Sequence, residues 1–150
     1  GEVSASQWAR FAGSLRLERR YPGIHGIGVI EEVHDVEAYE AQQRLDRPDF
    51  HIFPAHERDE WLPITYVEPL ADNFRAIGLD MAHEDNRYQA AVRARATGTT
   101  QIAGPIALVQ EDAPAPGFLI FAPRYEGPTG TDAERRRSFR QFVYAPFVVH

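Results

Sequence analysis

The sequence predicts an α+β fold in which an antiparallel sheet is covered by helices and preceded by an N-terminal helix. The expected elements follow in the order helix, strand, helix, two strands, helices, then three strands with a helix before the last. This order suits an antiparallel sheet with helices on one side better than a parallel strand-helix-strand series. The 150 residues, 43% hydrophobic and 25% charged, have the size and composition of one folded domain.

The first part of the chain alternates helix and strand. Ser4 begins a capping-box pattern, so residues 5–19 are expected to form an amphipathic helix that ends before Pro22. Residues 24–33 are rich in glycine, which is typical of a strand approached closely by another backbone or by a ligand. The order of these glycines differs from that of a dinucleotide-binding fingerprint. Asp35 is then expected to cap a helix that runs to about Leu45.

The middle of the chain is expected to form two strands and a short helix. Residues 50–53 predict a short strand, and residues 62–67 predict a second one because apolar side chains recur there at every other position. That alternation predicts that Leu62, Ile64 and Tyr66 share one face of the strand. Residues 70–77 are expected to form a short helix that stops at Gly78.

The last third predicts a helix followed by strands. Residues 84–96 show helical spacing, and Gly98 stands just past the end. Strands are expected at 100–102 continuing into 106–110, at 118–122 and at 141–149, with a turn at 113–117 and a short arginine-rich helix after the loop 127–131. A sheet of this kind, curved around its helices, leaves a cavity for a small ligand. The natural candidate is therefore a PAS-like module with an N-terminal stalk-type helix.

Composition excludes several classes of function. With 22 acidic residues against 16 basic ones the net charge is −6, so the field of the whole molecule repels nucleic acid and anionic lipid. The absence of cysteine excludes disulfides, thiolate chemistry and cysteine metal sites. The sequence has no run of about 18 apolar residues and no signal-peptide pattern.

The motifs of enzymes and of metal or cofactor sites are missing as well. The six histidines form no H-E-x-x-H motif and no pair four residues apart, so we expect them to be exposed or capping and predict no metal. None of the serines lies in a G-x-S-x-G elbow, and the glycine loop at 127–131 lacks the lysine of a phosphate-binding loop. We therefore predict neither a catalytic residue nor a cofactor.

Asp80 is the residue with the strongest functional signal. Its neighbours Leu79 and Met81 are apolar, so its carboxylate is expected to be partly desolvated unless a donor reaches it. Two interpretations remain open. Asp80 caps a helix that begins near Ala82, or it accepts a hydrogen bond from an N–H group of a ligand.

Seven segments, in register, resemble a CHASE domain over about residues 20–147. They are Tyr-Pro-Gly-Ile-His-Gly-Ile-Gly at 21–28, Glu-Arg-Asp-Glu at 57–60 with Pro-Ile-Thr-Tyr-Val-Glu-Pro at 63–69, Gly-Leu-Asp-Met at 78–81, Arg-Ala-Arg-Ala-Thr-Gly at 93–98, Leu-Val-Gln-Glu at 108–111, Pro-Gly-Phe-Leu at 116–119 and Val-Tyr-Ala-Pro-Phe at 143–147. No single segment is decisive, but their common order is hard to produce by chance.

The resemblance implies a periplasmic, extracytoplasmic sensory domain of a bacterial inner-membrane receptor, not an enzyme. The receptor's cytoplasmic part would be a histidine kinase of a two-component system or a nucleotide cyclase, often a diguanylate cyclase. Residues 1–20 would be the end of a stalk helix, and residues 21–150 the membrane-distal PAS-like part, with the membrane connections outside this chain. The implied partners are a small-molecule ligand and a second copy of the chain, which would form a homodimer through the N-terminal helix. A ligand-free dimerisation module of the same receptor class is the alternative.

The resemblance also implies a role for particular residues. In plant members, which are cytokinin receptors, an aspartate of a Leu-Asp-Met segment accepts hydrogen bonds from an adenine-like head group, and this aspartate corresponds to Asp80. A backbone contact falls near Ile102. The expected ligand is therefore a purine-like molecule or a small amine. The expected ligand-binding residues are Asp80, Tyr66, Thr65, Leu79, Met81, Ile102 and Phe121.

Overall fold

The computed structural model describes residues 24, 26–106 and 117–148. The helix expected at 5–19, most of the strand expected at 106–110 and most of the turn at 113–117 lie outside these residues. The elements of the described residues are β1 (Ile27–Glu31), α3 (Val36–Arg44), β2 (Ile64–Glu68), α4 (Leu70–Asn73), η1 (Phe74–Ala76), η2 (Met81–His83), α5 (Asp85–Thr97), β3 (Gln101–Ile106), β4 (Gly117–Tyr125), α6 (Asp132–Ser138) and β5 (Phe139–Val148). None of the helices in these described ranges is both long and apolar enough to cross a membrane.

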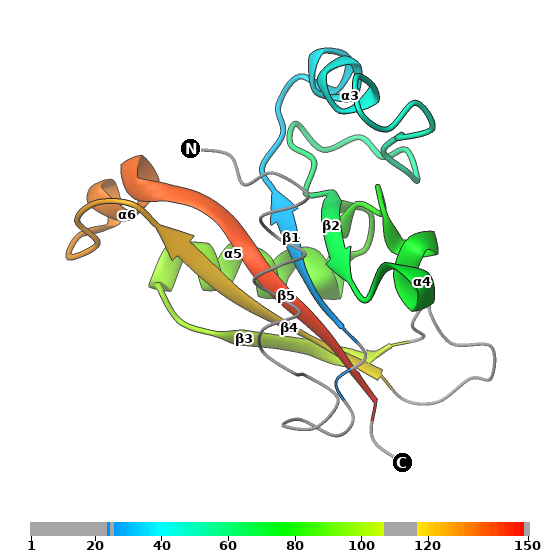
Figure 1. Ribbon diagram of the computed structural model, residues 1–150. Helices are drawn as coiled ribbons and strands as arrows, with labels where there is room; N and C mark the ends of the chain where they lie inside the picture. The colour runs from blue at the N-terminus through cyan, green and yellow to red at the C-terminus, as the bar shows by residue number, and fades with distance from the viewer. Residues whose placement is uncertain (1–23, 25, 107–116, 149–150) are drawn as a thin grey trace.

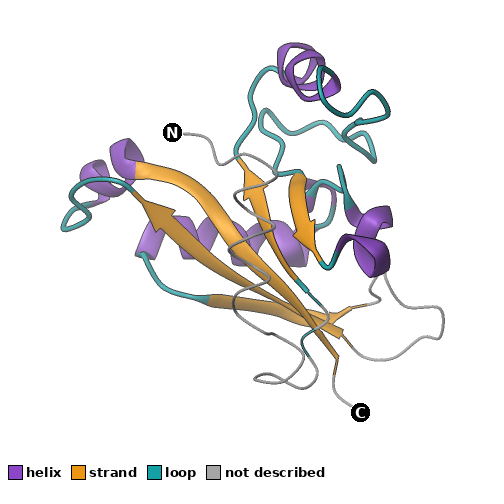
Figure 2. Cartoon of the chain, in the orientation of Figure 1, coloured by secondary structure: helices purple, strands orange, loops and turns teal. Residues whose placement is uncertain are grey.

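The strands form one antiparallel sheet in the order β2-β1-β5-β4-β3 (Figure 1). The two longest strands, β4 and β5, pair from Gly117↔Val148 to Tyr125↔Phe139, and α6 joins them at one end. Helix α5 lies across one face of the sheet and packs on β3, β4 and β5 (Figure 2). The α+β prediction of an antiparallel sheet covered by helices is therefore confirmed.

The main hydrophobic core lies between α5 and the sheet. Small alanines of α5, including Ala90, Ala91 and Ala94, let the helix approach the sheet closely. The sheet contributes larger side chains to the same core: Ile30, Ile64, Leu119, Phe121, Phe142 and Tyr144. The segment after η1 adds Leu79 and Met81, so the residues on both sides of Asp80 are part of this core.

Local sequence signals explain how the helices begin and end. The Asp35 carboxylate accepts a hydrogen bond from the backbone N–H of Ala38 at 3.1 Å, as predicted for the cap of α3. Helix α5 begins after Glu84, whose carboxylate accepts from the N–H groups of Asn86 and Arg87. It ends at Gly98, which has the left-handed conformation with φ +72°. Caps that involve neighbours in the sequence were therefore predictable.

The short strand predicted at 50–53 is wrong. Only Phe53 pairs there, in an isolated parallel bridge with Leu79. Its N–H donates to the carbonyl of Gly78, and its carbonyl accepts from the N–H of Asp80 at 2.8 Å. Pro48 and Pro54 have no N–H to donate, so the segment cannot extend a ladder in either direction. What remains is one contact that holds this segment beside Asp80.

The alternation predicted for residues 62–67 is also wrong beyond Ile64. Val29 pairs with Tyr66 but Ile30 pairs with Ile64, so Thr65 is an extra residue in a β-bulge. Because of the bulge, Val67 is part of the main core, whereas Tyr66 lies on the opposite face and packs near Val29. An extra residue changes which side chains face the core, because side chains in a strand alternate with a period of two.

Candidate functional site

The backbone around Asp80 is held on both sides by other parts of the chain. On one side, the N–H of Ile64 donates to the carbonyl of Leu79, and the N–H of Met81 donates to the carbonyl of Leu62, each at 2.9 Å. On the other side, Asp80 bonds to Phe53 through the bridge described above. Three segments distant in sequence therefore meet at Asp80.

The Asp80 carboxylate is completely buried and is satisfied by groups of the protein itself. Its Oδ1 atom accepts from the N–H of Leu62 at 2.7 Å and from the N–H of Ala82 at 2.9 Å. Its Oδ2 atom bonds to Nε2 of His56. The structure thus shows Asp80 as the cap of η2, one of the two interpretations that the sequence left open. A buried carboxylate is tolerated here because three donors replace its water.

His56 is the side chain beside Asp80 that sequence reasoning missed. Its ring is largely buried, not exposed, and it is the side chain that contacts the Asp80 carboxylate. The Nδ1 atom accepts a hydrogen bond from the backbone N–H of Arg58 at 3.0 Å, so the ring proton lies on Nε2 and His56 donates to Asp80. No spacing rule connects residues 24 positions apart, and only the fold brings this pair together.

Arg58 fastens the segment that carries His56 to the start of α5. Its Nε donates to the carbonyl of Ala82 at 3.0 Å, and its Nη2 donates to Asp85 at 2.6 Å. The guanidinium also lies over the ring of Tyr88, 4.0 Å from its centroid. The loop that positions His56 is therefore held by several contacts that depend on Asp80, Ala82 and α5 staying in place.

The predicted site residues divide between different parts of the fold. Leu79, Met81 and Phe121 share the main core, and Asp80 lies between the first two along the chain. Thr65 is fully buried in the bulge, where its hydroxyl bonds to the Tyr39 hydroxyl at 2.6 Å. Tyr66 lies on the opposite face of the sheet, and Ile102 on the edge strand β3 is 62% exposed. The structure brings Leu79, Asp80, Met81 and Phe121 into one region and leaves Tyr66 and Ile102 outside it.

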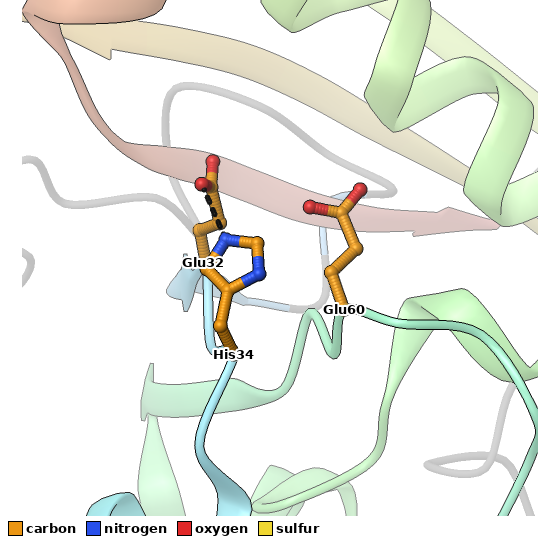
Figure 3. A group of neighbouring side chains, drawn as sticks. All are labelled: Glu32, His34 and Glu60. Atoms are coloured by element: carbon orange, nitrogen blue, oxygen red, sulfur yellow. Dashed lines mark hydrogen bonds and ion pairs between the residues drawn. The ribbon is translucent and has the colours of Figure 1, made fainter.

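A second polar cluster lies at the surface, and three of its residues have the chemistry of metal ligands. Glu32, His34 and Glu60 each offer one ligand atom, all within 4.8 Å of one another (Figure 3). Arg95, however, donates to both oxygens of Glu60 at 2.8 and 3.0 Å and to Glu32 at 2.9 Å. Because the guanidinium already bonds to both carboxylates, we assign this cluster to an ion-pair network that ties α5 to the segments after β1 and before β2.

This network makes stability depend on pH. Burial alone would raise the pKa of Glu60, but hydrogen bonds from Arg95 and Tyr88 outweigh it and hold the pKa below the ordinary value of 4.5. Such a group stabilises the fold above the pKa of the unfolded state, and its contribution is lost as the pH falls through the lower, folded-state value. We expect Glu60→Gln to cost about 1 kcal/mol at pH 7 and to lose less stability than the wild type between pH 5 and 3. Urea unfolding across this range measures the difference, and two parallel curves would contradict it.

An open groove of about 480 Å³ lies between the chain that follows α3 and the helical turn η1. Aromatic and basic side chains dominate its walls: Arg47, Phe50, His51, Phe53, Phe74 and Arg75. Its inner wall reaches the site, since Phe53 pairs with Leu79 and packs against the main core. This groove could not be predicted from the sequence, because its two walls are separated by the whole of β2.

Comparison with known protein families identifies the chain. The family model of the CHASE domain matches residues 1–150, the full length of the chain. No curated protein matches it. The match covers the described sheet, the helix across it and the segment that holds Asp80. The chain therefore belongs to the CHASE domain family, the extracytoplasmic sensory domains of membrane receptors.

Proposed function

We propose that this domain binds a small molecule in the periplasm of a bacterium and passes the signal to a cytoplasmic histidine kinase or nucleotide cyclase, such as a diguanylate cyclase. The observation that carries the ligand-binding part is the Asp80 carboxylate, which is completely buried and has one side-chain partner, His56, among the described residues. A buried carboxylate selects strongly for a donor, because an unpaired charge inside a protein is costly.

The proposed ligand carries an N–H donor on a planar or compact head group, as purine-like molecules and small amines do. Because Oδ1 of Asp80 is held by two backbone N–H groups, the ligand would take the place of His56 at Oδ2. A charge-assisted hydrogen bond of this kind contributes roughly 1.5 to 3 kcal/mol. Leu79, Met81 and Phe121 would supply apolar contacts. Of the other residues expected from the sequence, Tyr66 and Ile102 lie outside this region, and the hydroxyl of Thr65 is bonded to Tyr39.

The buried hydroxyl of Tyr144 supports the proposal that a ligand with a polar atom binds in the same core. Its side chain is 1% exposed, and its hydroxyl has no hydrogen-bond partner among the residues that the structure describes. Burial raises the pKa of this hydroxyl, so it remains protonated and can donate. Tyr144 shares its core cluster with Leu79, Met81 and Phe121. A ligand in this region would therefore meet two buried polar groups, one acceptor and one donor.

Signalling would follow from the release of His56. The loop at 56–60 is held through Arg58 and through the bond between His56 and Asp80, so a ligand at Oδ2 favours a state in which this loop has moved. A ligand shifts such an equilibrium only by its difference in affinity for the two states, and a reversal from 1:99 to 99:1 takes about 5.5 kcal/mol. We propose that the change reaches the membrane through the stalk helix at residues 1–20 and through a homodimer formed by that helix.

A ligand-free dimerisation module is the second candidate. It is favoured by the observation that His56, Leu62 and Ala82 already satisfy the Asp80 carboxylate, so that the fold needs no ligand to tolerate it. The two candidates predict opposite responses to small molecules.

Thermal-shift measurements with adenine, N6-substituted adenines and small aliphatic amines test the proposal. The wild type and Asp132→Asn, a matched change at an exposed carboxylate on α6, should each be stabilised by several degrees; saturation at 100 times Kd contributes about 2.7 kcal/mol. Asp80→Asn should lose the response when each protein is compared with its own ligand-free melting temperature. If no compound stabilises the wild type, or Asp80→Asn responds equally, the ligand proposal fails and the dimerisation module is the better description.

A further inference from the structure

The groove beside the Asp80 segment has the features of a second binding site, which does not depend on the role proposed for Asp80. Its volume of about 480 Å³ falls within the roughly 300 to 1,000 Å³ of small-molecule sites. One wall is the chain at 47–53, and the other is the turn η1 with Phe74 and Arg75. Each wall thus supplies a guanidinium and at least one aromatic ring.

Arg47 presents a pre-positioned positive charge to this groove. Its guanidinium carbon lies 4.9 Å from the centroid of Phe50 and 4.6 Å from that of Tyr66. Its N–H groups donate to the carbonyl of Thr65 and to the side-chain oxygen of Gln43, each at 2.5 Å. These contacts hold the side chain in one orientation and lower the entropy lost when an anion binds.

The charge of Arg47 is not neutralised by these contacts. All four partners are uncharged groups, and none of the ion pairs within 26–106 and 117–148 includes Arg47. The guanidinium carries five N–H donors in a planar fork that matches a carboxylate. Arg75 on the opposite wall is a second basic residue of the lining, and Asp49, its acidic residue, is exposed. The groove is therefore basic in a chain whose net charge is −6.

The aromatic side chains define the rest of the ligand. The rings of His51 and Phe53 lie 5.1 Å apart at 32°, and together with Phe50 they line the same wall as Arg47. Phe74 on the opposite wall is 59% exposed, although exposing a large apolar ring to water is unfavourable. A flat aromatic molecule inserted between the walls would cover Phe74 and stack on the facing rings.

We propose that this groove binds a small planar aromatic carboxylate, with its ring between Phe74 and the opposite wall and its carboxylate between Arg47 and Arg75. Such a ligand would also act on the Asp80 segment. Arg47 bonds to the carbonyl of Thr65 in β2, and Phe53 bonds to Gly78 and Asp80, so the wall at 47–53 is connected at two points to the backbone that positions Asp80. The groove is thus a second input to the same sensory domain.

Titration of the ¹⁵N-labelled chain with benzoate and benzamide, followed by chemical shifts, tests this proposal. The pair has the same ring and differs in charge. Benzoate should shift the amides of residues 47–53 and 74–77 in a saturable way, with a Kd at least five-fold lower than that of benzamide. Cyclohexanecarboxylate and inorganic phosphate, which lack the aromatic ring, should both bind at least three-fold more weakly than benzoate.

Two variants of exposed residues complete the test without disturbing the core. Arg75→Gln and Phe74→Ser should each weaken benzoate binding at least five-fold, whereas Arg136→Gln on α6 removes an equal charge far from the groove and should leave it unchanged. Equal binding of benzoate and benzamide, saturable shifts that leave the two walls unaffected, no saturable shift at all, or an equal effect of Arg136→Gln would overturn the proposal. Because Asp80 is unaltered in these proteins, the outcome is separate from that of the adenine and amine screen.

Discussion

Replacing Asp80 with alanine is expected to destabilise the domain by about 3 to 5 kcal/mol, because truncation leaves buried donors without a partner. The N–H groups of Leu62 and Ala82 and the ring N–H of His56 all lose their acceptor at once. The two backbone N–H groups lie out of reach of water in the folded state, since Leu62 is 0% and Ala82 1% exposed. Urea unfolding at neutral pH measures the loss directly.

The substitution Asp80→Asn tests the roles of the two carboxylate oxygens separately. Its carbonyl can replace Oδ1 and keep the bonds from Leu62 and Ala82, but its NH₂ group would face the Nε2–H of His56, donor against donor. His56 could accept only by moving its proton to Nδ1, which would break its bond with Arg58. We expect a loss of roughly 1 to 3 kcal/mol for Asp80→Asn. The exposed Asp85→Ala should cost no more than about 1 kcal/mol, and an equal loss there would contradict this account.

Gly78→Ala is expected to have an effect of similar size, on the order of 3 to 5 kcal/mol, for reasons of space and conformation together. Gly78 has φ +90°, and a Cβ atom built on it would lie 1.9 Å from the carbonyl oxygen of His51. The chain at 50–53 would have to move away, and the bond between the N–H of Phe53 and the carbonyl of Gly78 would be lost. Both the groove and the backbone of Asp80 depend on this contact.

Gly98 provides the matched control for that substitution. It also has a positive φ, +72°, but the nearest atom to its added Cβ would be Cδ of Arg135 at 3.5 Å, an ordinary contact. Gly98→Ala should therefore lower the free energy of unfolding only by the cost of holding alanine in the left-handed conformation, about 1 to 2 kcal/mol. Unfolding of both variants in denaturant gives the comparison, and a loss at position 98 as large as that at position 78 would show that steric overlap with His51 is not the cause.

The sequence predicted the elements whose signals are local. The cap of α3 at Asp35, the end of α5 at Gly98 and the strands β4 and β5 follow from neighbouring residues and from the spacing of apolar side chains. The order of these elements was enough for the α+β class, and seven motifs in register were enough for the family. Such features do not require knowledge of which distant segments meet.

The predictions failed where one extra residue or one distant contact decides the outcome. The bulge at Thr65 cannot be read from alternation, since the alternation itself continues in the sequence, and it places Tyr66 on the other face from Ile64. Residues 50–53 have the composition of a strand, but their flanking prolines and a single bridge to Leu79 leave them irregular. In both cases the pairing partner, not the segment, determines the conformation.

The sequence by itself determined the family and the fold class, and it singled out Asp80 as a candidate, because each rests on local motifs and on their order along the chain. The tertiary structure alone decided the partners: His56 on the Asp80 carboxylate, Arg95 between Glu32 and Glu60, and Arg47 against Thr65. These charged and polar groups come from segments far apart, and their pairing depends on the register of β1 and β2 and on the turn at Gly78. Long-range pairing is selected by packing and burial across the whole domain, and no local pattern encodes it.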